Sequence, residues 1–144
     1  MKHTTKAQYT VWTMFLLLLL FTLMLLISCS PHYSPYAHDR TAELKTKSLS
    51  LMNKADEPFS KHAEKVYGLK FDLQALNEHE QLRKRNGLKQ KQWKLLLDPN
   101  GHLLYGFFAK WEQDTILHEP FIGLERKLVG EAFDYMLDLE KQLK

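Results

Sequence analysis

The sequence predicts an all-α protein whose folded part is a small antiparallel bundle of about four helices. Apolar residues recur at helical spacing in three separate segments, within 44–55, 66–76 and 128–143. The connections between the expected helices are short, and only the stretch around 93–111 contains apolar runs that would also suit strands. The chain has one cysteine, so no disulfide within it contributes to stability.

The N-terminal segment has the layout of a secretory signal. Lys2 and Lys6 precede an uncharged apolar run from Val11 to Ile27, and polar residues follow it directly. On this pattern, the segment directs the chain to export and is not part of the folded domain.

The apolar run ends in Leu26-Ile27-Ser28-Cys29, which resembles the lipobox of bacterial lipoproteins. The resemblance implies a lipoprotein signal peptide at 1–28 that is cleaved after Ser28. It also implies that the Cys29 thiol is diacylated and the new amino group acylated, as by palmitate. Cys29 is therefore the expected lipidation site, and its two or three acyl chains would hold the protein in the membrane.

Two other interpretations of this segment stay open. The run could be a transmembrane anchor, but it is barely long enough for a helix to cross about 30 Å of hydrocarbon. No basic cluster follows it before Arg40. As a signal cleaved without lipidation, it lacks an A-x-A-like ending.

Ser30 stands where an aspartate would resemble the inner-membrane retention signal of enterobacterial lipoproteins. For a Gram-negative host we therefore expect a lipid-anchored protein of the outer membrane that faces the periplasm.

Cleavage would leave a tether and one domain. Residues 29–38 contain the lipidated cysteine and a stretch with two prolines and two serines, which favours a flexible, extended tether. Residues 39–144 are enough for one helical domain and too few for two.

The formal net charge of +3 falls to +1 when Lys2 and Lys6 leave with the signal. Charge is thus no argument for nucleic acid, and we expect none as a partner.

The first two expected helices of the domain are regular. The apolar face of the first comprises Leu44, Ser48, Leu51 and Ala55. For the second, Asp56 is the expected N-cap, Glu57 and Pro58 suit the first turn, and Gly87 is the expected stop. Its apolar seam comprises Val66, Leu69, Leu73 and Leu76.

The stretch from Trp93 to Trp111 is ambiguous. Asp98-Pro99-Asn100-Gly101 suits a type I turn between two strands, yet Leu104, Phe107 or Phe108, and Trp111 recur at helical spacing. Because two strands alone are marginal without a sheet to join, we expect two short helices around the turn.

The last expected helix lies within 119–144. One side of it comprises Leu128, Ala132, Met136, Leu139 and Leu143, and Val129, Phe133 and Leu137 widen this side. These residues predict an amphipathic helix that closes the bundle.

The acidic and histidine residues of the sequence do not have the spacing that catalytic or metal-binding motifs require. Glu78, His79 and Glu80 are adjacent, so on a helix they point about 100° apart, and Arg83 stands where a zinc-protease pattern needs a second histidine. A solvated charged face explains them, although Glu80 continues the apolar seam and would suit a partly buried partner of an arginine. The turn at Asp98 lacks the glycine and glutamate positions of an EF-hand.

Other catalytic patterns are absent from the sequence. It has neither a phosphate loop nor G-x-S-x-G, and acylation of the one cysteine would leave no thiol nucleophile. We therefore expect no metal, no cofactor and no enzymatic activity, with a dispersed catalytic triad as the one arrangement left open.

Two features suggest recognition of a partner. A basic stretch from Arg83 to Lys94 contrasts with an acid-rich last third, and aromatic residues concentrate between 93 and 111. Each feature also has a purely structural explanation. The charges could be paired between helices, and the aromatic rings could be part of the core. The candidate partner-binding residues are Trp93, Phe107, Trp111, Arg83, Lys89 and Lys91.

These observations favour a membrane-anchored binding or assembly module for an envelope protein. The pilotin lipoproteins of secretion systems are similar in size, class and anchor, and in no residue motif. The alternative is a small-ligand carrier or an enzyme that uses the bundle interior, for which inward-facing histidines or carboxylates are few.

Overall fold

The computed structural model describes residues 12–21, 33–83 and 87–143. The chain divides into two compact units, 1–30 and 31–144. In the first unit, residues 12–21 are helical, while Cys29 and the rest of the lipobox-like ending lie outside the described residues. Within the described part of the chain, no helix is both long enough and apolar enough to cross a membrane.

The second unit is all-helical. Its described residues contain no strand, which confirms the predicted fold class. The elements in chain order are α2 (Pro35–Met52), the 3-10 helix η1 (Phe59–Lys61), α3 (Ala63–Gln81), α4 (Gly87–Leu96), α5 (Leu104–Asp114) and α6 (Phe121–Lys141).

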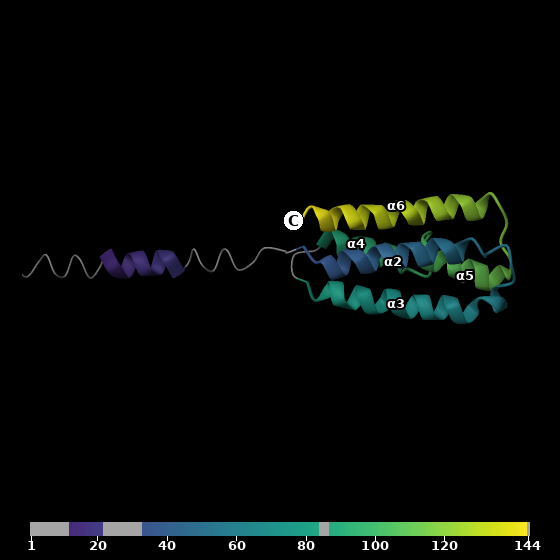
Figure 1. Ribbon diagram of the computed structural model, residues 1–144, viewed down its shortest axis with the longest axis horizontal. Helices are drawn as coiled ribbons and strands as arrows, with labels where there is room; N and C mark the ends of the chain where they lie inside the picture. The colour runs from purple at the N-terminus through teal and green to yellow at the C-terminus, as the bar shows by residue number, and fades with distance from the viewer. Residues whose placement is uncertain (1–11, 22–32, 84–86, 144) are drawn as a thin grey trace, which may run out of the picture. The chain divides into compact units, whose positions relative to one another are not determined.

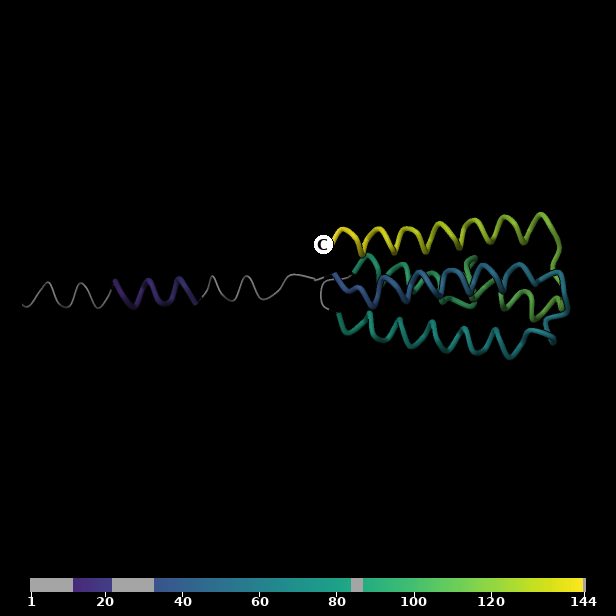
Figure 2. The backbone as a smooth tube through the Cα atoms, viewed as in Figure 1, coloured from purple at the N-terminus to yellow at the C-terminus, as the bar shows by residue number. Residues whose placement is uncertain are grey.

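The long helices α2, α3 and α6 run the length of the bundle, and α2 packs against both others. In Figure 1 the shorter helices α4 and α5 lie toward opposite ends of the bundle. Figure 2 shows that α2 runs opposite in direction to both α3 and α6. The described residues of the second unit thus contain five α-helices and the 3-10 helix η1, more than the expected four.

The first helix of the domain begins earlier than expected. Ser34 is the N-cap of α2, its Oγ accepts a hydrogen bond from the backbone N–H of Ala37 at 3.2 Å, and Pro35 occupies the first turn. Residues 35–38 therefore belong to the helix, and the expected tether over 29–38 is wrong for them. The expected face is confirmed, since Leu44, Ser48, Leu51 and Ala55 are all buried.

The expected start of the central helix is wrong and its seam is right. Residues 56–58 precede a turn of 3-10 helix, and α3 begins only at Ala63, after His62. Gly87 does not stop this helix but begins α4. The whole seam of Val66, Leu69, Leu73 and Leu76 is buried, as expected.

The turn between 98 and 101 joins two short helices, as expected. The backbone N–H of Gly101 donates to the carbonyl of Asp98 at 3.1 Å, and that of Asn100 to the Asp98 carboxylate at 2.9 Å. Gly106 packs on this turn so closely that a Cβ there would lie 1.9 Å from the carbonyl oxygen of Gly101. Glycine at 106 is therefore what allows α5 to fold back on the turn.

The last helix is confirmed, but one of its expected faces is rotated. Val129, Phe133 and Met136 are buried, whereas Leu128 is 37% exposed. The buried face also includes Ile122, Glu125 and Glu140. Two apolar stripes compete on α6, and packing against α2 and α4 selects the one through Phe133.

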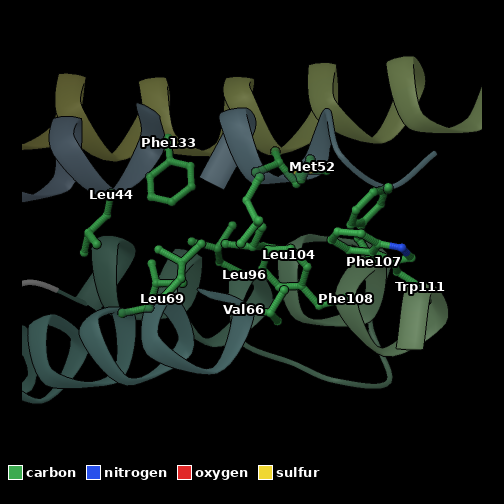
Figure 3. Packing of buried hydrophobic residues seen from close by; sticks show 14 of the residues in the cluster. Leu44, Met52, Val66, Leu69, Leu96, Leu104, Phe107, Phe108, Trp111 and Phe133 are labelled. Carbon is green, nitrogen blue, oxygen red and sulfur yellow. The ribbon is translucent and has the colours of Figure 1, made fainter. Parts of the chain in front are cut away.

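Aromatic and aliphatic side chains from all these helices form one core (Figure 3). Backbone hydrogen bonds close it at both ends. At one end, the N–H of Leu117 donates to Ala55 at 2.7 Å and that of Phe59 to Thr115 at 2.8 Å. At the other end, the N–H of Tyr33 donates to the carbonyl of Leu143 at 3.3 Å.

Candidate functional site

The three aromatic residues expected to bind a partner are core residues. Trp93 and Trp111 are fully buried and Phe107 is 2% exposed. Figure 3 shows Phe107 and Trp111 within the core. The Trp111 Nε1 donates to the carbonyl of Glu57 at 3.0 Å, and the Trp93 ring packs edge-on against Phe133. The interpretation of these rings as a partner surface is therefore wrong for the folded domain, and their alternative explanation as core holds.

The basic stretch from 83 to 94 does not form one surface either. Arg83 is largely buried and Lys89 is 1% exposed, while Lys91 faces solvent on α4. Two of the three basic residues expected to bind a partner thus point into the domain, where they pair with the buried carboxylates of Glu80 and Glu140. Only Lys91 of the six candidates is freely accessible.

A buried ionic cluster occupies the end of the bundle where α3 and α6 end and α4 begins. It consists of Glu80, Arg83, Lys89 and Glu140. Lys89 Nζ lies 2.8 Å from Glu80 and 2.7 Å from Glu140. Arg83 donates to both oxygens of Glu140 at 2.8 Å and to Glu80 at 2.8 Å. Two carboxylates thus face two cations, so the cluster is formally neutral.

The first residues of the domain are tied to this cluster. The backbone N–H of Ser34 donates to Oε1 of Glu140 at 2.7 Å. Burial acts to raise the pKa of Glu140, but hydrogen bonds from Arg83, Lys89 and Ser34 outweigh it and lower this pKa to about 2. Hydrogen bonding to Glu140 likewise raises the pKa of Arg83. The contacts of Glu140 with Ser34, Arg83 and Lys89 join four segments of the domain, which gives the cluster a structural role.

The sequence indicated part of this cluster. Periodicity placed Glu80 on the buried seam beside an arginine, and the Glu80–Arg83 pair confirms that. The broader interpretation of 78–80 as a solvated charged face is wrong for Glu80, which is fully buried. His79 instead packs edge-on against Tyr36. Among the described residues, no three histidine, cysteine or acidic side chains are grouped as a metal site would require.

A groove between α2 and α3 is the better candidate for binding, and we call it the α2–α3 groove. Its volume is about 560 Å³, and its lining is mainly apolar. The helices α2 and α3 supply it in equal numbers: Thr46, Lys47, Ser50, Leu51 and Lys54 from α2 and the turn after it, and His62, Lys65, Gly68, Leu69 and Asp72 from α3 and its N-cap. Leu51 and Leu69, both members of the core, are the two leucines of the lining and are 8% and 5% exposed, so the hydrocarbon parts of other lining side chains contribute much of its apolar area.

The charges of the α2–α3 groove are mostly positive. Lys47 is held by Glu43 at 2.8 Å and lies 3.6 Å from Asp72. Lys54 lies 3.5 Å from Glu57, an exposed pair that water screens. No ion pair within the described part of the chain engages Lys65. Three lysines around an apolar floor give this groove the character of a site for an acidic, partly apolar ligand.

His62 lies at the end of the α2–α3 groove and is nearly buried. Its Nε2 lies 3.2 Å from a carboxylate oxygen of Glu57, and this hydrogen bond lowers the pKa of Glu57. Its Nδ1 is buried and has no hydrogen-bond partner in the described residues. The ring is tilted on Trp111 at 5.6 Å, which connects the groove to the aromatic core.

A second groove, between α3 and α4, has a different character. Its volume is about 680 Å³ and it is lined by Gln74, Asn77, Gln81, Gln90, Trp93, Lys94, Leu97 and Asp98. Four amide side chains dominate it. Because the lining of this second groove is about half polar, whereas that of the α2–α3 groove is mainly apolar, the α2–α3 groove is the stronger candidate.

The α2–α3 groove could not be predicted from the sequence. Its lysines at 47, 54 and 65 are scattered along the chain, and only the packing of α2 against α3 brings them together. The available signal was weak: a glycine at 68 inside an otherwise good helix, where glycine lowers helix stability relative to alanine.

Comparisons with known proteins give no further guidance. We found no family model that matches the chain, no significantly similar curated protein and no significantly similar solved structure.

Proposed function

We propose that this chain is a lipid-anchored lipoprotein of the bacterial envelope whose helical domain binds an acidic segment of a periplasmic protein. The residues Leu26-Ile27-Ser28-Cys29 support the anchor, by their resemblance to a lipobox. The α2–α3 groove supports the binding role and is the observation that carries it. The site of action proposed is the periplasmic face of the outer membrane, and the activity is binding or assembly, not catalysis.

The lining of the α2–α3 groove defines the partner's chemistry. Leu51 and Leu69 offer apolar contact together with the hydrocarbon stems of the lysines. The exposed ammonium groups of Lys54 and Lys65 attract carboxylates. An amphipathic helix that carries acidic residues beside an apolar face satisfies both, in the manner of other helices bound in grooves. The lysines would mainly raise the encounter rate, and the apolar floor would supply affinity.

Gly68 gives independent support for a site in this groove. It lies in the interior of α3, where glycine lowers helix stability by about 0.5–1 kcal/mol relative to alanine. A Cβ built at Gly68 meets no described heavy atom within 4 Å, so close packing inside the domain does not require glycine. The missing side chain instead leaves the α2–α3 groove open.

Site-specific crosslinking in native membranes tests the proposal. A photo-crosslinking residue in place of Ser50, in the groove, should capture one envelope protein, and the crosslinked segment should be acidic and amphipathic. Gly68→Leu in the same protein should abolish capture by filling the groove. The control is Ala75→Leu, at an exposed position on the same helix outside the groove, which should leave capture unchanged. Equal capture by both variants would contradict the proposal.

The alternative, a carrier or enzyme that uses the bundle interior, has less support. Large side chains fill the interior, with Trp93, Phe107, Phe108, Trp111 and Phe133 at most 2% exposed. A small molecule that co-purifies with the protein in place of a crosslinked partner would favour this alternative.

A further inference from the structure

One end of the bundle has charges inside and leucines outside. Arg83 and Lys89 turn inward to the ionic cluster. Their neighbours Leu82 and Leu88 are 84% and 58% exposed. This reverses the usual arrangement, in which apolar side chains are buried and charged ones face water.

Tyr36 lies at the same end and is 59% exposed. Its ring packs edge-on against His79 at 5.2 Å, which fixes it at the start of α2. Figure 1 shows that α2 and α4 begin at this end and that α3 and α6 end there. Tyr36 of α2, Leu82 at the C-cap of α3 and Leu88 of α4 are therefore exposed at one end of the domain, and we call them the apolar end.

The chain connects the apolar end to the proposed anchor by a short link. Ser34 is tied to Glu140 at 2.7 Å, so the folded domain starts there. Five residue steps separate Cys29 from Ser34, and a fully extended chain of that length spans at most about 17 Å. The bundle is longer than this, since the 19 residues of α3 alone extend about 28 Å.

We propose that the apolar end docks on the lipid bilayer, with Leu82 and Leu88 inserted in the headgroup–acyl boundary and Tyr36 among the headgroups. The inference rests on the proposed lipid anchor at Cys29. A bilayer fits as the occupant because the short link holds this end near the membrane surface. Tyrosine also suits the interface, where its ring is in an apolar layer and its hydroxyl is hydrated.

Other apolar side chains are exposed on the same helices and make matched controls. Phe71 on α3 is 75% exposed and lies 11 residues before Leu82, about 16 Å along the helix. Leu95 on α4 is 54% exposed and lies 7 residues after Leu88, about 10 Å along the helix. All four side chains are exposed, so exposure alone predicts the same result at each position. Membrane contact at the apolar end predicts a difference between the two positions at that end and the two controls.

Depth measurement on the full lipidated protein tests this inference. Because the chain has one cysteine and acylation would block it, Leu82→Cys, Leu88→Cys, Phe71→Cys and Leu95→Cys each supply a single free thiol for a fluorescent label. Each labelled protein is reconstituted in vesicles of phosphatidylethanolamine and phosphatidylglycerol that contain a nitroxide-bearing lipid. We expect quenching at 82 and 88 to exceed that at 71 and 95 several-fold.

Intact mass of the reconstituted protein separates the two proposals. If the acyl chains are present and quenching is the same at all four positions, the docking of the apolar end is wrong and the anchor stands. If the mass shows no acyl chains, the proposed anchor is wrong, and the docking inference falls with it.

Discussion

Lys89 Nζ lies 2.7 Å from a carboxylate oxygen of Glu140, and both side chains are buried at the same end of the bundle. The two residues come from α4 and α6, so their contact fixes one helix against the other. Glu140 also accepts from Ser34 and Arg83. One carboxylate therefore holds together the start of α2, the end of α3 and the start of α4.

Charge reversal should distinguish Lys89 from Lys91. Lys89→Glu places a third carboxylate in the buried ionic cluster, and loss of one partner from such a cluster costs about 3–5 kcal/mol. Lys91→Glu changes an exposed side chain and should alter the free energy of unfolding by no more than about 0.5 kcal/mol. Urea unfolding followed by circular dichroism measures both. Similar effects of the two variants would contradict the buried position of Lys89.

The ionised state of Glu140 predicts how stability depends on pH. Its pKa is about 2 in the folded state and near 4.3 in an unfolded chain, so the unfolded state binds the proton more readily. The contribution is fully present above about pH 4.5 and is lost as the pH falls toward 2. We expect a loss of about 2 kcal/mol across this window.

Glu140→Gln is the control for this titration. The variant should be less stable at neutral pH and should lose less stability than the wild type between about pH 4.5 and 2, because its amide does not titrate there. Parallel pH profiles for the two proteins would show that Glu140 does not make this contribution.

Helical periodicity predicted the buried seam of α3 and the face of α2 because local spacing determines which residues share a side. It could not choose between the stripes through Leu128 and Phe133 on α6, since both are apolar and only neighbouring helices decide. The ionic cluster was half predictable for the same reason. Glu80 and Arg83 are close in sequence, whereas Lys89 and Glu140 meet only through packing. The α2–α3 groove likewise exists only in the folded pair of helices.

The position of Ser34 predicts where the domain can be truncated. A fragment of 33–144 retains the N-cap and the hydrogen bond from Ser34 to Glu140, which a fragment of 39–144 lacks. A hydrogen bond to a charged group contributes about 1.5–3 kcal/mol. The free energy of unfolding of the shorter fragment, measured by urea unfolding, should therefore be lower by at least that amount. Equal stability of both fragments would mean that the domain starts near Asp39 after all.

Two glycines should respond to alanine in opposite directions. Gly106→Ala brings a Cβ within 1.9 Å of the carbonyl oxygen of Gly101 and should destabilise the domain by about 1–3 kcal/mol. Gly68→Ala adds a methyl group in open space on a helix and should stabilise it by about 0.4–1 kcal/mol. Thermal unfolding of both variants checks the prediction. Destabilisation by Gly68→Ala would contradict the claim that packing leaves this position open.

The lipid anchor is the claim on which both proposals depend, and the intact mass of the protein extracted from membranes tests it most directly. We predict a chain that begins at Cys29, lacks residues 1–28 and carries the added mass of two or three acyl chains, while Cys29→Ser accumulates as the uncleaved precursor. An unmodified full-length chain in the membrane, or a Cys29→Ser variant that is processed and released like the wild type, would contradict it.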